Sequence, residues 1–208
     1  MARVKVCGIT NLNDARACVK AGAYALGFNF YPKSPRYLPP LEASEIIRQL
    51  PDGVFAVGVF VNEPDSAAIT TAAKRAGIHA VQLHGEESPS FCNSLNDLFI
   101  IKALRVGDDF NPAEAANFQT DAILLDAFKA GVYGGTGRSF DWTVAASTKE
   151  FVRKLFLAGG LNATNVGPAI KTVQPYAVDV CSGVESSPGR KDPAKLGAFM
   201  DAIRKADK

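Results

Sequence analysis

The chain has 208 residues, of which 47% are hydrophobic and 21% charged, and its formal net charge is +2. This composition supports a buried core, and the charge is too small to indicate nucleic-acid binding. No stretch approaches the ~18 uninterrupted apolar residues of a membrane helix, and the N-terminus lacks an apolar signal region. The four cysteines are scattered and form no CxxC pair, which argues against a zinc site. We therefore expect a cytoplasmic protein with reduced thiols and one domain over residues 1–208.

Short apolar segments alternate with helical segments along the whole chain. The expected strands are residues 3–7, 24–30, 54–61, 78–84, 98–104, 121–125, 154–158 and 177–181. The expected helices are residues 12–22, 41–50, 65–76, 89–95, 112–118, 142–151, 163–173 and 193–205. Apolar strands of this kind are typical of a parallel sheet buried on both faces. Eight strand–helix units with a period of roughly 25 residues predict a (β/α)8 barrel. An open doubly wound sheet is the alternative, but its GxGxxG fingerprint is absent after the first strand.

Polar side chains gather where the expected strands end, and the active site of a (β/α)8 barrel lies at that end. Cys7 ends the first strand, on the face opposite Val4 and Val6, and Asp126 follows the apolar sixth strand. A thiolate next to positive charge can act as a base, and a partly desolvated carboxyl group suits a general acid. We expect Cys7 and Asp126 to face each other across the barrel mouth. Simple packing of the thiol and a capping role for the carboxylate are the alternatives.

Two glycine-containing loops follow the seventh and eighth strands. Gly159 and Gly160 lie in the first loop, and Ser182 and Gly183 lie in the second. Glycine lets backbone N–H groups approach a ligand closely, and these two loops are the usual phosphate site of the fold. Turn geometry alone would also explain a single glycine. The pair of loops predicts a ligand that carries a phosphate group, such as a sugar phosphate.

Further candidates surround this region. Arg36 lies in a proline-rich loop, residues 31–40, where a guanidinium group can bind a carboxylate in a bidentate manner. A solvated surface arginine is the alternative. Gln82 and His84 share one face at the end of the fourth strand, so both are candidates to line the pocket.

The first and last strands become neighbours when a barrel closes. Asp179 and Cys181 share a face of the last strand, as Lys5 and Cys7 share a face of the first. We expect Asp179 to line the pocket and to pair with Lys5. We also expect Cys181 to approach Cys7, which would make the site sensitive to oxidation.

Together these segments resemble the phosphoribosylanthranilate isomerase family. The matching segments are Lys5–Thr10, Gly27–Tyr37, Gly58–Asn62, Gln82–Glu86, Leu125–Asp126, Gly134–Gly137, Phe140–Trp142, Leu157–Leu161, Ser182–Glu185, Pro188–Gly189 and Lys191–Asp192. The resemblance implies a (β/α)8 barrel that needs no metal or organic cofactor. It also implies an Amadori rearrangement of N-(5-phosphoribosyl)anthranilate to 1-(2-carboxyphenylamino)-1-deoxyribulose 5-phosphate in tryptophan biosynthesis.

The same resemblance implies roles for individual residues. Cys7 would be the general base, Asp126 the general acid and Arg36 the group that binds the anthranilate carboxylate. The chain departs from the family pattern at Cys181, where a serine is more usual, and at Ala127.

Two other functions stay open at this stage. One is a related sugar-phosphate isomerase of the histidine-pathway type, which relies on a pair of aspartates. The other is a non-catalytic barrel that binds a phosphate ligand. In each case we expect a small-molecule ligand and neither a nucleic acid nor a membrane as partner. We expect a monomer, and the apolar helix faces leave a dimer open.

Overall fold

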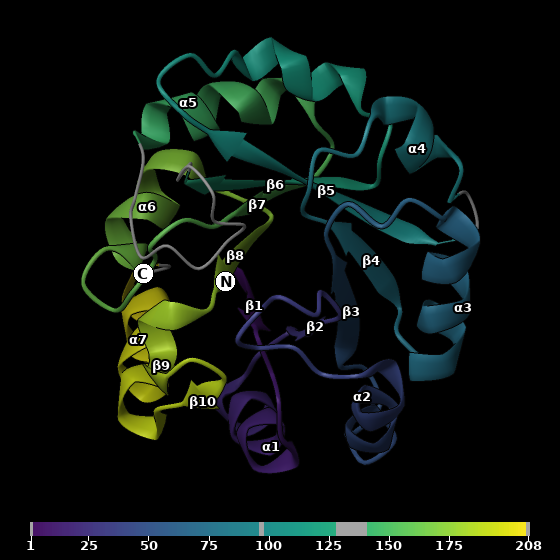
Figure 1. The fold of residues 1–208 in the computed structure, drawn as a ribbon. Coiled ribbons are helices and arrows are strands. Elements are labelled where there is room, and N and C mark those ends of the chain that lie inside the picture. The colour runs from purple at the N-terminus through teal and green to yellow at the C-terminus, as the bar shows by residue number, and fades with distance from the viewer. Residues whose placement is uncertain (1, 96–97, 128–140, 207–208) are drawn as a thin grey trace.

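The computed structural model describes residues 2–95, 98–127 and 141–206. Eight parallel strands close into a barrel in the order of the sequence, and helices surround it (Figure 1). The strands are β1 (Arg3–Cys7), β2 (Ala25–Asn29), β3 (Phe55–Phe60), β4 (Ala80–Leu83), β5 (Phe99–Val106), β6 (Ala122–Ala127), β7 (Leu155–Leu157) and β8 (Ala177–Val180). The predicted (β/α)8 barrel is therefore confirmed.

The α-helices are α1 (Leu12–Ala21), α2 (Pro40–Ile47), α3 (Ser66–Ala76), α4 (Pro89–Asn93), α5 (Trp142–Thr148), α6 (Val166–Val173) and α7 (Pro193–Ala206). Three short 3-10 helices, η1 (Pro112–Asn117), η2 (Lys149–Phe151) and η3 (Ser182–Val184), complete the helical segments of the described residues. Among those residues, no helix is long and apolar enough to span a membrane.

Three segments differ most from the sequence prediction. The helix expected at 112–118 is the 3-10 helix η1, and the one expected at 163–173 begins only at Val166. The Asn165 side chain accepts a hydrogen bond from the backbone N–H of Asn162, so the loop extends to that point. A small antiparallel pair, β9 (Glu185–Ser187) and β10 (Arg190–Lys191), follows β8 and was not expected. The glycine-rich segment predicted at 127–140 lies, beyond Ala127, outside the described residues.

The barrel divides the apolar side chains into two cores. Alternate residues of each strand point outward and pack against the helices, as Val4 and Val6 do. The other residues point inward and form a smaller core: Ala25, Val57, Ala80, Ile101, Ala103, Ala122, Leu124, Phe156, Ala158 and Ala177. Lys5, on the inward face of β1, forms an ion pair with Asp179 of β8 at 2.9 Å, as expected from the sequence.

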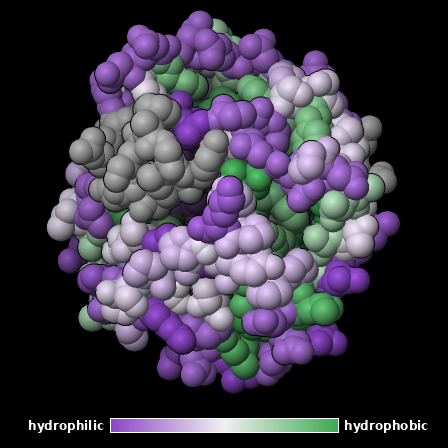
Figure 2. All heavy atoms as spheres, in the orientation of Figure 1, coloured by the Kyte–Doolittle hydropathy of each residue, from purple (hydrophilic) through white to green (hydrophobic). Residues whose placement is uncertain are grey.

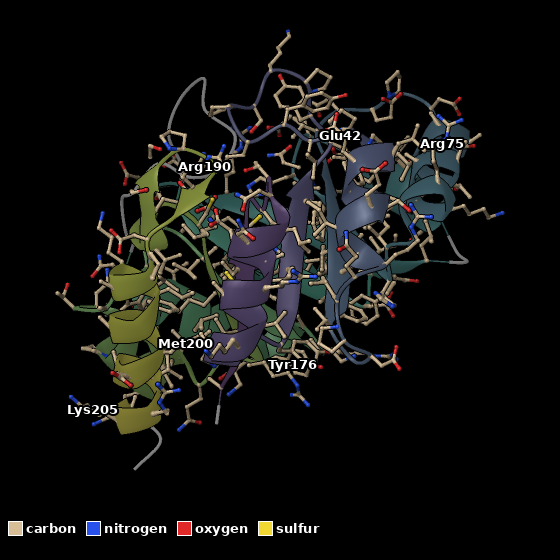
Figure 3. All side chains as sticks on the ribbon, turned by 90° about the horizontal axis from the view of Figure 1, so that it is seen from below. Glu42, Arg75, Tyr176, Arg190, Met200 and Lys205 are labelled. Atoms are coloured by element: carbon tan, nitrogen blue, oxygen red, sulfur yellow. The ribbon has the colours of Figure 1, made fainter. Side chains whose placement is uncertain are left out.

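Aromatic rings and two cations fill the amino end of the barrel. The Arg3 guanidinium lies 4.5 Å from the ring centroid of Tyr176, and the Lys154 ammonium lies 4.8 Å from that of Phe99. Figure 3 shows Tyr176 at the opposite end of the barrel from Arg190, which lies in β10, on the side of the carboxyl ends of the strands. The aromatic layer fills the barrel below Lys5 and Asp179, so a ligand reaches the barrel interior from the carboxyl end.

Candidate active site

A cavity of about 500 Å³ opens at the carboxyl end of the strands. Figure 2, in the orientation of Figure 1, shows a mainly hydrophilic surface with hydrophobic residues between the loops near the centre. Nine of the ten predicted site residues line this cavity: Cys7, Arg36, Gln82, His84, Asp126, Gly159, Gly160, Asp179 and Ser182. A second cavity, of about 590 Å³, lies among the starts of β5, β6 and β7. The active-site end of this fold is the carboxyl end, which favours the first cavity.

The Cys7 sulfur lies in a tight and positively charged surrounding. A Cβ atom on Gly27, in the adjacent strand, would lie 2.7 Å from this sulfur, so glycine at that position leaves room for the thiol. A hydrogen bond from the Cys181 thiol is the main cause that lowers the pKa of Cys7. Burial opposes this, while the charges of Lys5 and Lys191 reinforce it. The net effect favours the thiolate, which is the form that accepts a proton.

The Asp126 carboxylate is buried at the mouth, with only 4% of the residue exposed. Its Oδ1 accepts a hydrogen bond from the backbone N–H of Ala127 at 2.9 Å. Its Oδ2 lies 3.3 Å from Nε2 of His84, and Nδ1 of His84 lies 2.7 Å from the Gln82 amide nitrogen. When the amide nitrogen donates to Nδ1, Nε2 carries the proton of the neutral ring, and it lies near the Asp126 carboxylate without forming a hydrogen bond in this geometry. The three side chains therefore form a row along the cavity wall.

A buried charge fixes the segment that follows His84. The Glu87 carboxylate accepts hydrogen bonds from the backbone N–H of Gly85 at 2.9 Å and from that of Asn62 at 2.8 Å. It also forms an ion pair with Lys102 at 2.7 Å. These contacts join the loops after β3 and β4 to β5. They fix the backbone of the residue that directly follows His84.

The Asp179 carboxylate is buried beside Lys5, one pleat below the sulfur atoms. Burial raises the pKa of Asp179 to about 6 in spite of the adjacent lysine, and negative charge on Cys7 and Asp126 adds to the effect. Lys5 itself stays protonated: burial would lower its pKa, but Asp179 and Cys7 raise it above the ordinary value. The cavity floor therefore carries one permanent positive charge close to the Cys7 thiol.

Arg36 does not extend freely into the cavity. Its Nε and Nη2 bind the Glu185 carboxylate at 2.9 and 2.6 Å, which is a bidentate ion pair. Glu185 also binds Nζ of Lys191 at 2.9 Å, and the same ammonium donates to the carbonyl oxygen of Cys7 at 2.6 Å. Burial would raise the pKa of Glu185, but Arg36 and Lys191 hold it below the ordinary value. This network of Arg36, Glu185 and Lys191 connects the proline-rich loop to the backbone of the candidate base.

The two glycine-containing loops meet at the side of the cavity. Gly159 and Gly160 have φ angles of +85° and +64°, the left-handed conformation that glycine adopts without strain. Ser182 begins η3 and lines the cavity. Gly183 is not among the lining residues; a Cβ atom there would overlap the carbonyl oxygen of Leu161. Gly183 therefore allows the second loop to pack directly on the first.

Comparison with known proteins identifies the family. A family model described as N-(5'phosphoribosyl)anthranilate (PRA) isomerase matches residues 4–202. The chain belongs to this family. The N-(5'-phosphoribosyl)anthranilate isomerase of Geobacter metallireducens is 50% identical over 200 residues, which cover 96% of this chain and 98% of the relative.

Solved structures of the isomerase family have the same fold. Monomers made from the dimeric phosphoribosylanthranilate isomerase of Thermotoga maritima superpose with a TM-score of 0.88 at 42% identity, covering 99% of this chain and 100% of that one. A phosphoribosylanthranilate isomerase in complex with reduced 1-(o-carboxyphenylamino)-1-deoxyribulose 5-phosphate gives a TM-score of 0.87 at 43% identity, with coverage of 99% and 100%.

Glu185, Glu87 and Lys191 were not singled out as site residues from the sequence of this isomerase-family member. Glu185 lies beyond the end of β8, at the start of β9, where strand alternation no longer predicts direction. Glu87 lies four residues beyond β4, and its partner Lys102 lies on the outward face of β5. The available signal for Glu185 and Lys191 was a carboxylate two residues after a glycine of the phosphate loop and six residues before a lysine. Within the described residues, no group of three or more His, Cys, Asp and Glu side chains could hold a metal ion.

Proposed function

We propose that this chain isomerises N-(5'-phosphoribosyl)anthranilate to 1-(2-carboxyphenylamino)-1-deoxyribulose 5-phosphate, a step of tryptophan biosynthesis. One observation carries the proposal: a thiol with a lowered pKa and a buried carboxylate line the same cavity in a chain of this family. The family member bound to the reduced form of this product supports the same substrate class. Residues 1–208 act as one catalytic domain in the cytoplasm.

Ring opening comes first, with Asp126 as the general acid. Protonation of the furanose ring oxygen breaks its bond to the anomeric carbon and leaves a Schiff base with the anthranilate nitrogen. The backbone N–H of Ala127 binds one carboxyl oxygen and orients the other toward the cavity. His84, positioned by Gln82, lies next to that second oxygen and stabilises the carboxylate that remains after the proton has left.

Proton abstraction follows, with Cys7 as the general base. The thiolate removes the proton from C2′ of the Schiff base, and the resulting enolamine tautomerises to the ketone. Lys5 and Lys191 favour the thiolate before the substrate arrives. The Cys181 thiol beside the same sulfur is the largest cause that lowers the pKa of Cys7. These three neighbours explain how a cysteine acts as a base near neutral pH.

Substrate binding uses the two sides of the cavity. Arg36 binds the anthranilate carboxylate, and Glu185 presents the guanidinium in a fixed orientation through Nε and Nη2. Backbone N–H groups of Gly159, Gly160 and Ser182, which line the cavity, bind the phosphate, and Gly183 lets the second loop pack on the first. Gln82, His84 and Asp179 line the space between, where the ribose carbons react.

The direct test is turnover of freshly prepared phosphoribosylanthranilate, followed by loss of anthranilate fluorescence, together with growth of a tryptophan auxotroph that lacks this isomerase. We expect both activity and growth. Cys7→Ala and Asp126→Asn should each reduce kcat by about 10²- to 10⁴-fold, as expected for loss of a general acid or base. Absence of turnover by the native chain, or full activity of both variants, would overturn the proposal.

For the oligomeric state we propose a monomer. Large hydrophobic side chains that are exposed among the described residues, Tyr37, Leu41 and Phe151, come from three different elements or loops. The Thermotoga maritima relative is dimeric. Light scattering coupled to size-exclusion chromatography separates a mass near 22.1 kDa from twice that value.

A further inference from the structure

Two cysteines meet at the junction of the first and last strands. The register pairs Val6 with Val180, so Cys7 and Cys181 come next in adjacent parallel strands. Adjacent strands are about 4.8 Å apart, and a disulfide needs a Cα–Cα distance of about 4.4–6.8 Å. The Cys181 thiol is within hydrogen-bonding reach of the Cys7 sulfur. Both side chains line the cavity and both are partly exposed.

We propose that Cys7 and Cys181 form a reversible oxidation site, in which a hydroperoxide converts the two thiols to a disulfide inside the active site. The inference does not depend on the reaction that the barrel catalyses, because it concerns the covalent chemistry of the two sulfur atoms.

The oxidation proceeds in two balanced steps. The Cys7 thiolate attacks one oxygen of hydrogen peroxide, the O–O bond breaks, and hydroxide leaves as Cys7 becomes a sulfenic acid. The Cys181 sulfur then attacks the Cys7 sulfur, the S–O bond breaks, and the oxygen leaves as water with the Cys181 proton. The two thiols lose two electrons, the peroxide gains them, and the hydroxide takes up a solvent proton to form a second water.

The surroundings assign different parts to the two cysteines. Lys5 and Lys191 stabilise negative charge on Cys7, which makes it the nucleophile toward peroxide. The pKa of Cys181 is raised, above all by the hydrogen bond to Cys7 and by burial, so it stays protonated until the sulfenic acid forms. The Cys181 sulfur also lies 3.7 Å from Oε1 of Glu185.

The remaining cysteines provide internal controls. Cys18 and Cys92 are buried in the outer core, with 0% and 2% of their surfaces exposed. Burial raises their pKa values to about 12 and about 11, so both stay protonated and inaccessible. Under conditions that oxidise the cavity pair, these two thiols should remain reduced.

The experiment treats the native chain with hydrogen peroxide, alkylates the free thiols and digests it with trypsin. Trypsin places Cys7 in the peptide 6–16, Cys181 in the peptide 172–190 and Cys92 in the peptide 76–102. We expect peptides 6–16 and 172–190 to be joined by a disulfide, and the intact mass, measured before alkylation, to fall by about 2 Da. Dithiothreitol should release the two peptides and restore the activity of the treated sample.

The matched variant is Cys181→Ser, which keeps a hydroxyl donor beside Cys7 and removes the second sulfur. Without it, Cys7 should proceed to a sulfinic acid, with a gain of about 32 Da that dithiothreitol does not reverse. Each protein is compared with its own untreated sample, and Cys92→Ala should behave like the native chain. If the native chain shows the 32 Da product and no joined peptides, the proposal is wrong. That result decides the matter even if Cys181→Ser fails to fold, since it is read from the native chain alone.

Discussion

The carboxylate of Glu185 should be as important for stability as for binding. Its side chain is 4% exposed and faces Arg36 at 2.6 Å and Lys191 at 2.9 Å. Replacing Glu185 by alanine leaves the two cations without their common partner. Loss of one member of a buried ion pair costs about 3–5 kcal/mol. Arg36 is 13% exposed and is partly compensated by water, so we expect about 3 kcal/mol for Glu185→Ala.

Glu185→Gln keeps the shape and one acceptor oxygen, so its expected cost is smaller, about 2 kcal/mol, as for a hydrogen bond to a charged group. Urea unfolding at pH 7, followed by circular dichroism, measures both values. With a slope of about 3 kcal/mol per molar urea, the midpoint should fall by about 1 M for the alanine variant. The Michaelis constant should rise in both variants, because the Arg36 guanidinium loses its fixed orientation.

The exposed pair of Asp201 and Arg204, on α7, provides the control. Asp201→Asn should leave the urea midpoint within error of the native value, since surface ion pairs contribute little to stability.

The pKa of Glu185 is lowered in the folded state. Its contribution is therefore complete above an unfolded pKa of about 4.3 and is lost as the pH falls through the folded pKa. If Glu185→Ala unfolds like the native chain, the network does not stabilise the barrel and the reasoning fails.

Three further predictions concern other parts of the cavity. Gly183→Ala should raise the Michaelis constant and lower the urea midpoint, because the new Cβ would overlap a backbone carbonyl of the facing loop. Gly197→Ala is the control: its Cβ would have no atom within 4 Å, so the variant should not destabilise the chain. The pKa of Asp179 is raised to about 6, so the contribution of this residue to the free energy of unfolding falls as the pH rises from about 4 to 6. Asp179→Asn should remove this part of the pH dependence. A variant whose stability depends on pH as the native chain does would contradict the prediction. Lys191→Met should raise the pKa of Cys7 and shift the acid limb of the kcat/KM profile to higher pH, while the exposed Lys171→Met should not.

The barrel and most of the cavity could be predicted because both follow from local regularities. Alternation along each strand indicated that Cys7, Gln82 and Asp126 point inward, and the carboxyl ends of parallel strands necessarily meet. The partner of Arg36 could not be predicted in this way. Glu185 is 149 residues further along the chain and belongs to a hairpin whose position depends on the closed barrel. A contact of that kind is specified by packing rather than by spacing.

The start of α6 shows the same limit on a smaller scale. The apolar pattern predicted a helix from 163, but two asparagine side chains satisfy backbone groups of the preceding loop. Nδ2 of Asn162 and Nδ2 of Asn165 both donate to the carbonyl oxygen of Gly160, at 3.2 and 3.0 Å. These contacts delay the helix by three residues and shape the loop that carries Gly159. Hydrogen bonds from side chains to the backbone compete with helix formation, and the spacing of apolar residues in the sequence does not reveal them.

The junction between β1 and β8 has a consequence for how the chain acquires its activity. The candidate base and Lys5 come from β1, whereas Asp179 and Cys181 come from β8 and the residue that follows it, 174 residues further along the chain in the case of Lys5 and Asp179. During synthesis on a ribosome, the first strand leaves the exit tunnel long before its last neighbour exists. A nascent chain that stops short of β8 therefore carries Cys7 and Lys5 but lacks Cys181 and Lys191, which also lower the pKa of the thiol. The full set of neighbours that favours the thiolate is therefore complete only after β8 and the segment that follows it have joined β1.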